Sequence, residues 1–305
     1  MFEADELESS SLYLFRTKNM FSHRVKNEAI IDLPSTWKDY LLSEIEQWRV
    51  GEHEIVLWSL GGAGFVLKTK KATIYIDPYL GPSISKEIIR AIPIPIDPND
   101  IRQIDALIMT HEHEDHCDRN TIVALGRNTK AIFVGSPKSV DLILGWNTSR
   151  ERVVVMKPYQ KLNVKDVKVT ALPAKDPNPD IDALTYHLQA GDANLFHSGD
   201  SSYFEGYKEI GEKFRVDIAL LNLARNPPQW AVKQYMSYCD VVRAAMDLKA
   251  KVVIPMHWDM WKLAIEDPYV LKPIMASQNP EVNVVVLKVG DRFEYRASRS
   301  KRREV

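Results

Sequence analysis

The chain has 305 residues, enough for one large domain or two small ones with a sizeable core. Forty Lys and Arg residues against 41 Asp and Glu residues give a formal net charge of -1, which argues against nucleic acid or a membrane surface as the partner. The sequence also has no apolar run near the roughly 18 residues of a membrane span and too few cysteines for a disulfide framework, so we expect a cytoplasmic protein with a small-molecule partner.

An amphipathic helix is predicted near the N-terminus, where apolar residues recur at helical spacing from Trp37 to Trp48. Residues 1–50 are therefore expected to form a helical extension packed on the core. Residues 51–296 show no linker composition and are expected to make one domain. Residues 297–305 are expected to be a solvated basic tail.

Short β-rich runs begin at Glu54: EIVLWSL, GFVLKT and ATIYIDP indicate three consecutive strands. The proline-rich stretch 81–100, with a short helical run SKEIIRAI, predicts a loop or lid over a site. From DALIMT to VVIPM, apolar strands alternate with helices, including helices expected at 205–213 and 233–248. This order predicts an α+β fold in which two sheets lie between layers of helices.

Candidate metal ligands follow DALIMT directly, in HEHEDHCD at residues 111–118. Side chains alternate in an extended segment, so His111 and His113 point the same way and can share one ion. Asp115 and His116 follow as the chain turns toward a helix, and can reach a second ion. A polar surface loop is the alternative, but so many ligand types directly after a buried strand favour metal binding.

Two later strand ends supply further candidates, Asp200 in NLFHSGDS and His257 in VVIPMHWD. Two ions about 3.5 to 4 Å apart need a shared ligand, and the carboxylate of Asp200 suits that role. His257 is the final candidate, with a partly buried structural histidine as the alternative. Asp118 precedes RNTIVAL and is predicted to cap that helix and to orient a ligand rather than to coordinate metal.

The order of THEHEDH, SGDS and a late strand-ending His resembles the metallo-β-lactamase superfamily, whose ligand signature is HxHxDH followed by Asp and His. A closer resemblance, over roughly residues 37–265, is to the L-ascorbate-6-phosphate lactonase group; IRQIDALIMTHEHEDHCD, KPYQKLNVKDV, HSGDSSY and AKVVIPMHWDMW carry it. The resemblance implies an αββα sandwich, two divalent ions and hydrolysis of a sugar-acid phosphate lactone in carbohydrate metabolism.

The resemblance also assigns roles to single residues. Asp176 stands where the superfamily commonly has another ligand His, and is expected to be a ligand. Asp77 ends ATIYIDP where the superfamily has an Asp that hydrogen-bonds the His loop; a plain turn acid is the alternative. His197 matches the lactonase pattern, and its functional and structural interpretations stay equally open. His187 lies inside a strand and is expected to be a packed residue.

These residues predict hydrolysis by a metal-bound hydroxide, with Asp115 as the catalytic residue that holds the nucleophile and accepts its proton. The ions are expected to be Mn²⁺ or Zn²⁺, and a carboxylate at Asp176 favours Mn²⁺. The expected substrate is a small anionic lactone, with Arg225 and Trp258, both near strand ends, as candidate substrate-binding residues.

Two alternative functions remain at this point. A two-metal phosphodiesterase or nuclease would use the same geometry, but the sequence lacks a basic, aromatic-interleaved surface signal. A non-catalytic metal-binding protein would normally have lost some ligands, whereas every expected position is filled. A homo-oligomer is a further expectation, because the lactonase group tends to assemble.

Overall fold

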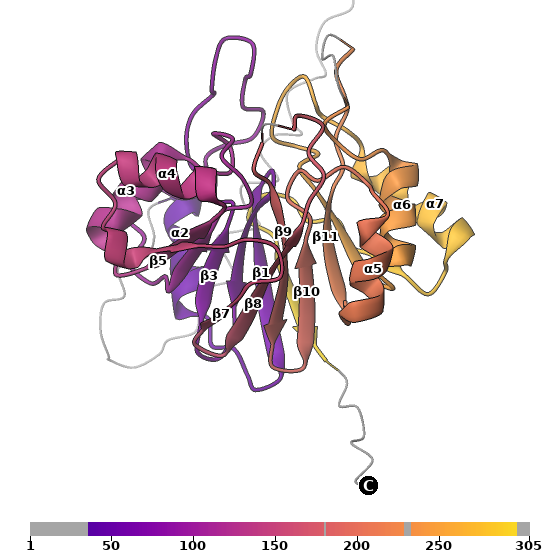
Figure 1. Ribbon diagram of the computed structural model, residues 1–305, viewed down its shortest axis with the longest axis horizontal. Coiled ribbons are helices and arrows are strands. Elements are labelled where there is room, and N and C mark those ends of the chain that lie inside the picture. Colours follow the sequence, from indigo (N-terminus) through magenta and orange to yellow (C-terminus); the bar gives the residue numbers. More distant parts are fainter. Residues whose placement is uncertain (1–35, 180, 229–232, 298–305) are drawn as a thin grey trace, which may run out of the picture. The chain divides into compact units, whose positions relative to one another are not determined.

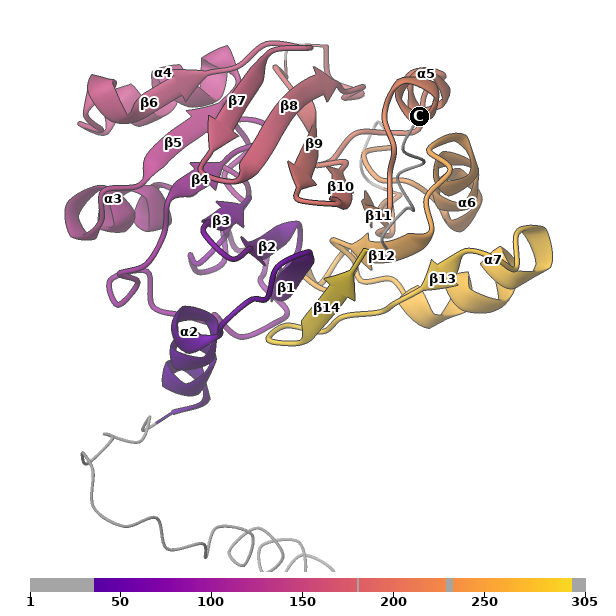
Figure 2. The ribbon, with the colours of Figure 1, turned by 90° about the horizontal axis from the view of Figure 1, so that it is seen from below.

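The computed structural model describes residues 36–179, 181–228 and 233–297. Two seven-stranded sheets face each other, and helices cover their outer faces (Figures 1 and 2). The order in the first sheet is β14-β1-β2-β3-β4-β5-β6, and in the second β13-β12-β11-β10-β9-β8-β7. The αββα sandwich expected from the sequence is therefore confirmed.

The first sheet contains β1 (Glu54–Gly61), β2 (Gly64–Lys68), β3 (Thr73–Ile76), β4 (Ala106–Ile108), β5 (Ile132–Gly135), β6 (Val153–Val155) and β14 (Arg292–Arg296). The second contains β7 (Lys161–Val164), β8 (Val167–Pro173), β9 (Leu184–Ala190), β10 (Ala193–His197), β11 (Ile218–Asn222), β12 (Val252–Met256) and β13 (Asn283–Val284). The helices are α2 (Trp37–Gln47), α3 (Arg119–Asn128), α4 (Pro137–Gly145), α5 (Gly206–Lys213), α6 (Tyr238–Asp247) and α7 (Leu271–Gln278), with short 3-10 helices at Arg150–Arg152 and Pro268–Val270.

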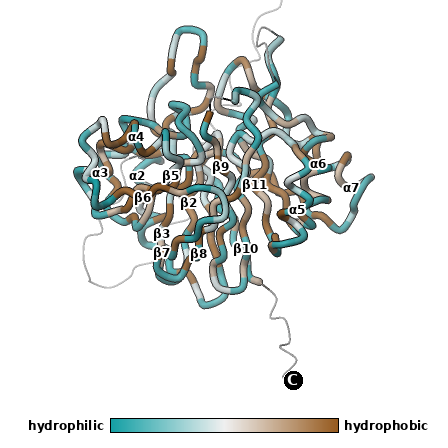
Figure 3. The backbone as a smooth tube through the Cα atoms, in the orientation of Figure 1, coloured by the Kyte–Doolittle hydropathy of each residue, from teal (hydrophilic) through white to brown (hydrophobic). Residues whose placement is uncertain are grey.

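The apolar residues form three layers of core. In β1, Ile55 and Leu57 belong to the cluster between the two sheets, whereas Val56 and Trp58 face the helices α2, α3 and α4. A separate cluster joins the second sheet to α5, α6 and α7. Because the strands are covered on both faces, their sequences are nearly continuous runs of apolar residues. Figure 3 shows this as hydrophobic strands between outer elements that carry more hydrophilic residues.

Each sheet has the same internal order. Strands β1, β2 and β3 are antiparallel, and β3 to β6 are parallel; likewise β8, β9 and β10 are antiparallel, and β10 to β13 are parallel. The carboxyl ends of parallel strands meet at one edge of a sheet, where loops gather binding residues. The segments after β3, β4, β10 and β12 therefore come to such edges.

The predicted helix near the N-terminus is present and begins after Thr36. The hydroxyl of Thr36 accepts a hydrogen bond from the backbone N–H of Asp39, whose carboxylate accepts one from the backbone N–H of Thr36. This capping box satisfies two groups that a helix start otherwise leaves unpaired. Residues 1–35 and 298–305 lie outside the described residues, so the proposed boundaries of the extension and the tail stay predictions.

The predicted helical run SKEIIRAI is wrong. The hydroxyl of Ser85 accepts hydrogen bonds from the backbone N–H groups of Glu87 and Ile88, which makes a turn. Beyond it, Arg90 forms a β-bridge with Trp261. Pairing with a distant segment therefore replaces the helical hydrogen bonds. Helix α6 also starts later than expected, at Tyr238, because Ser237 caps it.

Among the described residues, no helix is long and apolar enough to cross a membrane.

The packing of α2 generates a stability prediction. Ile45 is fully buried in the cluster beneath the helix, whereas Tyr40, on the same helix, is 63% exposed. Ile45→Ala leaves a cavity and should lower the free energy of unfolding by about 2 to 5 kcal/mol. Tyr40→Ala should change it by less than about 1 kcal/mol. Urea denaturation of both variants checks this, and equal losses would contradict the packing of α2.

Candidate metal centre

The HEHEDH segment leaves the end of β4 and turns back toward α3. The carbonyl of His113 accepts hydrogen bonds from the backbone N–H groups of His116 (3.0 Å) and Cys117 (2.7 Å). This turn brings the ring of His116 back to His111, with ring centroids 4.1 Å apart. Asp118 then caps α3, as predicted, by accepting hydrogen bonds from the backbone N–H groups of its first turn.

The structure gathers the six main candidate ligands into two adjacent groups. Within each group, one potential ligand atom per residue lies within 4.8 Å of the others. The first group is His111, His113 and Asp200, and the second is Asp115, His116 and His257. Imidazole nitrogens and carboxylate oxygens together are the donors that zinc and similar divalent ions take in proteins.

Asp200 lies where the two groups meet. Its Oδ1 is 3.4 Å from Nε2 of His116 and 3.5 Å from Nε2 of His257, although both histidines belong to the second group. Nε2 of His257 is also 3.2 Å from Oδ2 of Asp115. A carboxylate between two ligand groups has the position that a shared ligand needs.

Unpaired buried atoms show that this cluster fits a cation. Among the described residues, Nε2 of His116 and Oδ1 of Asp200 are buried without a hydrogen-bond partner. A buried polar atom without a partner costs free energy, and a metal ion between these atoms would remove that cost. In the first group, Nε2 of His111 and Nδ1 of His113 are 2.9 Å apart, so both nitrogens face the same space.

The charges in the cluster also favour a cation. Burial lowers the pKa of His116, but the carboxylates of Asp200, Asp115 and Asp77 outweigh burial and raise it well above its ordinary value. Burial and the neighbouring His116 lower the pKa of His111 to about 3, so that its ring is neutral at pH 7. The carboxylates thus attract positive charge, and a neutral imidazole offers a lone pair to it.

Asp77 connects the end of β3 to the His loop. Its carboxylate accepts hydrogen bonds from the backbone N–H (2.8 Å) and hydroxyl (2.7 Å) of Thr110 and from Nδ1 of His116 (2.8 Å). The last bond holds Nε2 of His116 toward the cluster and fixes which ring nitrogen carries the proton. This contact is of the kind that the family resemblance implies for Asp77.

A tight turn places Asp200 after β10. His197 accepts a hydrogen bond at Nδ1 from the backbone N–H of Gly199 and donates from Nε2 to the carbonyl of Ala63. Both ring nitrogens of His197 are therefore used within the fold, which favours its structural interpretation. Gly199 has φ +51°, and a Cβ there would lie 2.8 Å from the side chain of Thr110. Only glycine allows this approach.

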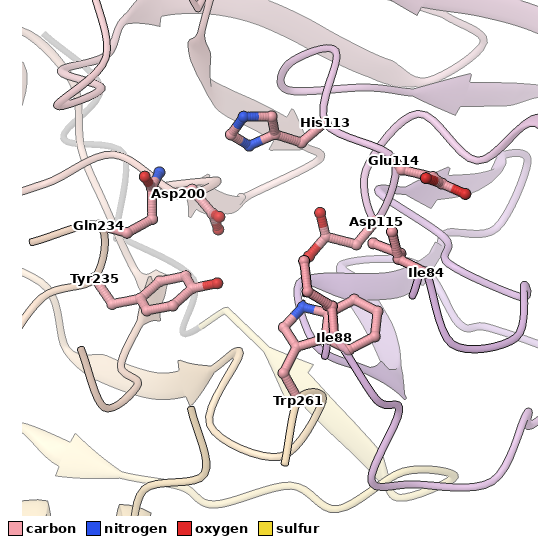
Figure 4. Close-up of a pocket in the computed structure, with 9 residues that line it drawn as sticks. All are labelled: Ile84, Ile88, His113, Glu114, Asp115, Asp200, Gln234, Tyr235 and Trp261. Atoms are coloured by element: carbon pink, nitrogen blue, oxygen red, sulfur yellow. Dashed lines mark hydrogen bonds between the residues drawn. The ribbon is translucent and has the colours of Figure 1, made fainter. Parts of the chain in front are cut away.

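A cavity of about 410 Å³ opens beside the cluster. Figure 4 shows the side chains of His113, Asp115, Asp200 and Tyr235 pointing toward a common space. The indole of Trp261 donates a hydrogen bond to Oδ2 of Asp115 (2.9 Å). The full lining consists of Ile84, Ile88, His113, Glu114, Asp115, Asp200, Gln234, Tyr235 and Trp261.

Three predicted residues lie elsewhere. The carboxylate of Asp176 belongs to neither ligand group and accepts hydrogen bonds from the side-chain amide of Gln234 (3.1 Å) and the backbone N–H of Asn178 (2.8 Å). Arg225 is exposed and Trp258 is half-buried, and neither lines the cavity. Their proposed roles stay predictions.

The residues that the sequence did not single out are Trp261, Tyr235 and Gln234. Trp261 lies three residues after Trp258 in HWDMW, and nothing local distinguishes the two indoles. The proline-rich loop is the sequence feature that points to further lining residues. It predicts a segment over the site, and it supplies Ile84 and Ile88 to the cavity. His187, inside β9, bonds the carbonyl of Arg215, away from the cluster.

Comparisons with known proteins agree with this arrangement. Residues 72–258 match the family described as Beta-lactamase superfamily domain. A relative from Salmonella heidelberg (strain SL476), named probable L-ascorbate-6-phosphate lactonase UlaG, is 30% identical to this chain over an alignment that covers 85% of this chain and 86% of the relative.

Solved structures share the fold at lower identity. Igni18, a metallo hydrolase from Ignicoccus hospitalis, superposes with a TM-score of 0.66 at 19% identity and covers 80% of this chain and 100% of its own. An isothiocyanate hydrolase from Delia radicum gut bacteria gives a TM-score of 0.67 at 18% identity, with 80% and 100% covered. The chain thus belongs to the metallo-β-lactamase superfamily, and it is a metal-dependent hydrolase with candidate ligand groups for divalent metal at this edge of its sandwich.

Proposed function

We propose that the chain hydrolyses a lactone, a cyclic carboxylic ester, at a centre of two divalent ions. The observation that carries this proposal is the placement of Asp200 between two ligand groups beside a cavity of about 410 Å³. The lactonase name of a relative at 30% identity supports the choice of ester over the other bonds that such centres cleave. L-ascorbate 6-phosphate, the compound in that name, is the first candidate substrate.

In this proposal His111, His113 and Asp200 hold one ion, and Asp115, His116, His257 and Asp200 hold the other. When bound, such ions lower the pKa of a coordinated water from about 15.7 toward about 7 and polarise a carbonyl oxygen. Zn²⁺ and Mn²⁺ are the candidate metals. The preference for Mn²⁺ depends on Asp176 as a ligand, whereas its carboxylate accepts hydrogen bonds from Gln234 and Asn178.

Asp115 is the proposed catalytic residue. Burial raises the pKa of its carboxyl, but His116, His257 and the indole of Trp261 outweigh burial and lower it well below the ordinary value. Asp115 is therefore ionised at neutral pH and can accept a proton. We assign it the proton that the attacking water loses as its oxygen bonds to the acyl carbon; that proton passes to the alkoxide released when the ring C–O bond breaks.

Tyr235 is proposed to donate a hydrogen bond to the substrate. Its hydroxyl points into the cavity (Figure 4), and the centroid of its ring lies 4.8 Å from that of the His257 ring. Burial and the carboxylates of Asp200 and Asp115 raise the pKa of Tyr235 well above the ordinary value. The hydroxyl therefore keeps its proton and can stabilise negative charge that develops on an ester oxygen.

Other expectations from the sequence stay predictions: a cytoplasmic location, a part in carbohydrate metabolism, a homo-oligomeric state and a small anionic substrate. A hydrolysis screen tests the reaction itself. Purified protein with Zn²⁺ or Mn²⁺ is expected to open sugar-acid lactones, L-ascorbate 6-phosphate among them. Turnover of phosphodiesters with none on any lactone would replace the proposal by the nuclease-type alternative.

The ligand groups generate a prediction about metal content. Protein expressed with added Zn²⁺ or Mn²⁺ should contain about two ions per chain, measured by elemental analysis. Asp200→Asn should lose at least one of them, because the remaining amide oxygen is a weaker ligand and carries no charge. His187→Gln, at a buried histidine outside the cluster, is the matched control and should keep both ions. Equal metal content in the two variants would remove Asp200 from the centre.

A second prediction concerns Asp115→Asn. The amide keeps the shape of the side chain but cannot accept a proton, so kcat on a lactone should fall by about 100-fold or more. Circular dichroism should show an unchanged fold. Metal content must be measured in the same preparation, because loss of an ion would also abolish turnover. Full activity in a variant with normal metal content would exclude Asp115 from proton transfer.

A further inference from the structure

We propose that Ile84, Ile88 and Trp261 bind an uncharged, apolar substituent on the lactone ring and so determine which lactones the chain accepts. The inference rests on the proposed lactone hydrolysis. It concerns the part of the substrate that does not react, and it replaces the anionic group expected from the sequence with a hydrocarbon group.

The cavity has two chemically different sides. His113, Asp115 and Asp200 belong to the metal cluster, and Gln234 and Tyr235 add polar groups. Ile84, Ile88 and Trp261 supply the apolar side, and the two isoleucines pack against the cluster that contains Trp261, Tyr79 and Met260. Figure 4 shows the indole of Trp261 with its nitrogen toward Asp115.

The apolar side of the cavity, formed by Ile84, Ile88 and Trp261, is called the apolar wall below. Hydrogen bonds fix this wall before any ligand binds. Arg90 pairs with Trp261 in a β-bridge, and the flanking bonds run from Ala91 N–H to the Met260 carbonyl (2.7 Å) and from Lys262 N–H to the Ile89 carbonyl (3.0 Å). The loop is also closed on itself by a bond from Ile84 N–H to the Ile88 carbonyl (3.1 Å).

Two further contacts complete the wall. The guanidinium of Arg90 donates to the carbonyls of Tyr79 (3.0 Å) and Gly81 (3.2 Å), which holds the loop to the segment after β3. The indole N–H of Trp261 is bonded to Asp115, so its ring cannot rotate away without losing that bond. A preformed wall binds an apolar group without the entropic cost of ordering the loop.

The described lining of the cavity offers a phosphate no basic side chain. Among its described lining residues there is no Lys or Arg, and Glu114 adds a carboxylate beside those of the cluster. Lys233 and Lys262, next in sequence to lining residues, are exposed and do not line the cavity.

The hydrophobic effect gives the size of the expected preference. A fully buried methylene group contributes up to about a fourfold gain in binding. In a cavity that stays partly open, about a twofold to fourfold gain per methylene is expected. A phosphate dianion gains nothing from such a wall and loses water in leaving solvent.

A matched substrate series tests the wall. The γ-lactones that carry a hydrogen, an ethyl or a pentyl group share one reacting ring, and L-ascorbate 6-phosphate is the charged comparison. The value of kcat/KM should rise about twofold to fourfold per added methylene. The dissociation constants of the ring-opened 4-hydroxyalkanoates, measured by calorimetry, should fall in the same proportion. This second measurement needs no turnover.

Variants connect the preference to the wall. In Ile84→Ser/Ile88→Ser the gain per methylene should shrink to less than about 1.5-fold in both measurements. Ile89→Ser, in the same loop and half-buried but outside the lining, is the control and should keep the full gain. Circular dichroism and metal content of all variants are compared with the unaltered chain.

The outcomes separate the two proposals. A flat series in the unaltered chain, or better turnover of L-ascorbate 6-phosphate than of the pentyl lactone, would overturn the apolar wall and leave lactone hydrolysis standing. A gain that survives in Ile84→Ser/Ile88→Ser would also overturn it. If no lactone is hydrolysed, the proposed function fails, and the series of dissociation constants still decides whether the wall binds apolar groups.

Discussion

Buried between the ends of β3 and β4, the carboxylate of Asp77 accepts three hydrogen bonds, two from Thr110 and one from His116. Thr110 directly precedes His111, so the start of the HEHEDH turn is held to the neighbouring strand. The bond to His116 sets the orientation of the His116 ring, five residues after His111. Asp77 itself has a positive φ of 45°, which is unfavourable for a side chain with a Cβ and persists because these bonds compensate for it.

The second sheet contacts the His loop through Thr110. Gly199 packs against its side chain, and this contact sets how close the turn that carries Asp200 comes to the His loop. His197, the last residue of β10, bonds the carbonyl of Ala63 in the turn between β1 and β2 of the first sheet. The metal centre is therefore a junction between two sheets, and its ligand distances depend on contacts across the sandwich as much as on the loops themselves.

The sequence predicts a site residue well when neighbouring residues in the chain determine the position of its side chain. His111, His113, Asp115 and His116 lie within one six-residue segment that follows a buried strand, so the turn alone groups them. Asp200 and His257 follow apolar strands, and the sandwich brings such strand ends together. These placements need only the order of strands, which hydrophobic patterning reveals.

The remaining features depend on contacts between distant segments. Trp261 enters the cavity because its backbone pairs with Arg90, and Trp258, three residues earlier, has no such partner strand. Asp176 bonds the amide of Gln234, 58 residues away in the chain. The helical propensity of SKEIIRAI likewise yields to pairing with residues 260–262. No local pattern encodes these choices, because the competing conformations differ in tertiary partners rather than in intrinsic preference.

The pairing of β14 with β1 has a consequence for the order of events during synthesis. Glu54 pairs with Arg296, and Trp58 with Arg292, so one of the last described segments completes a sheet begun by one of the first. Until that segment leaves the ribosome, β1 has a free edge with unpaired backbone groups, which is a template for pairing with another chain. Closing such a long loop is also slow compared with forming local contacts. The nascent chain thus carries an open edge from the synthesis of β1 until that of β14, and the pairing of β14 is the step that seals it.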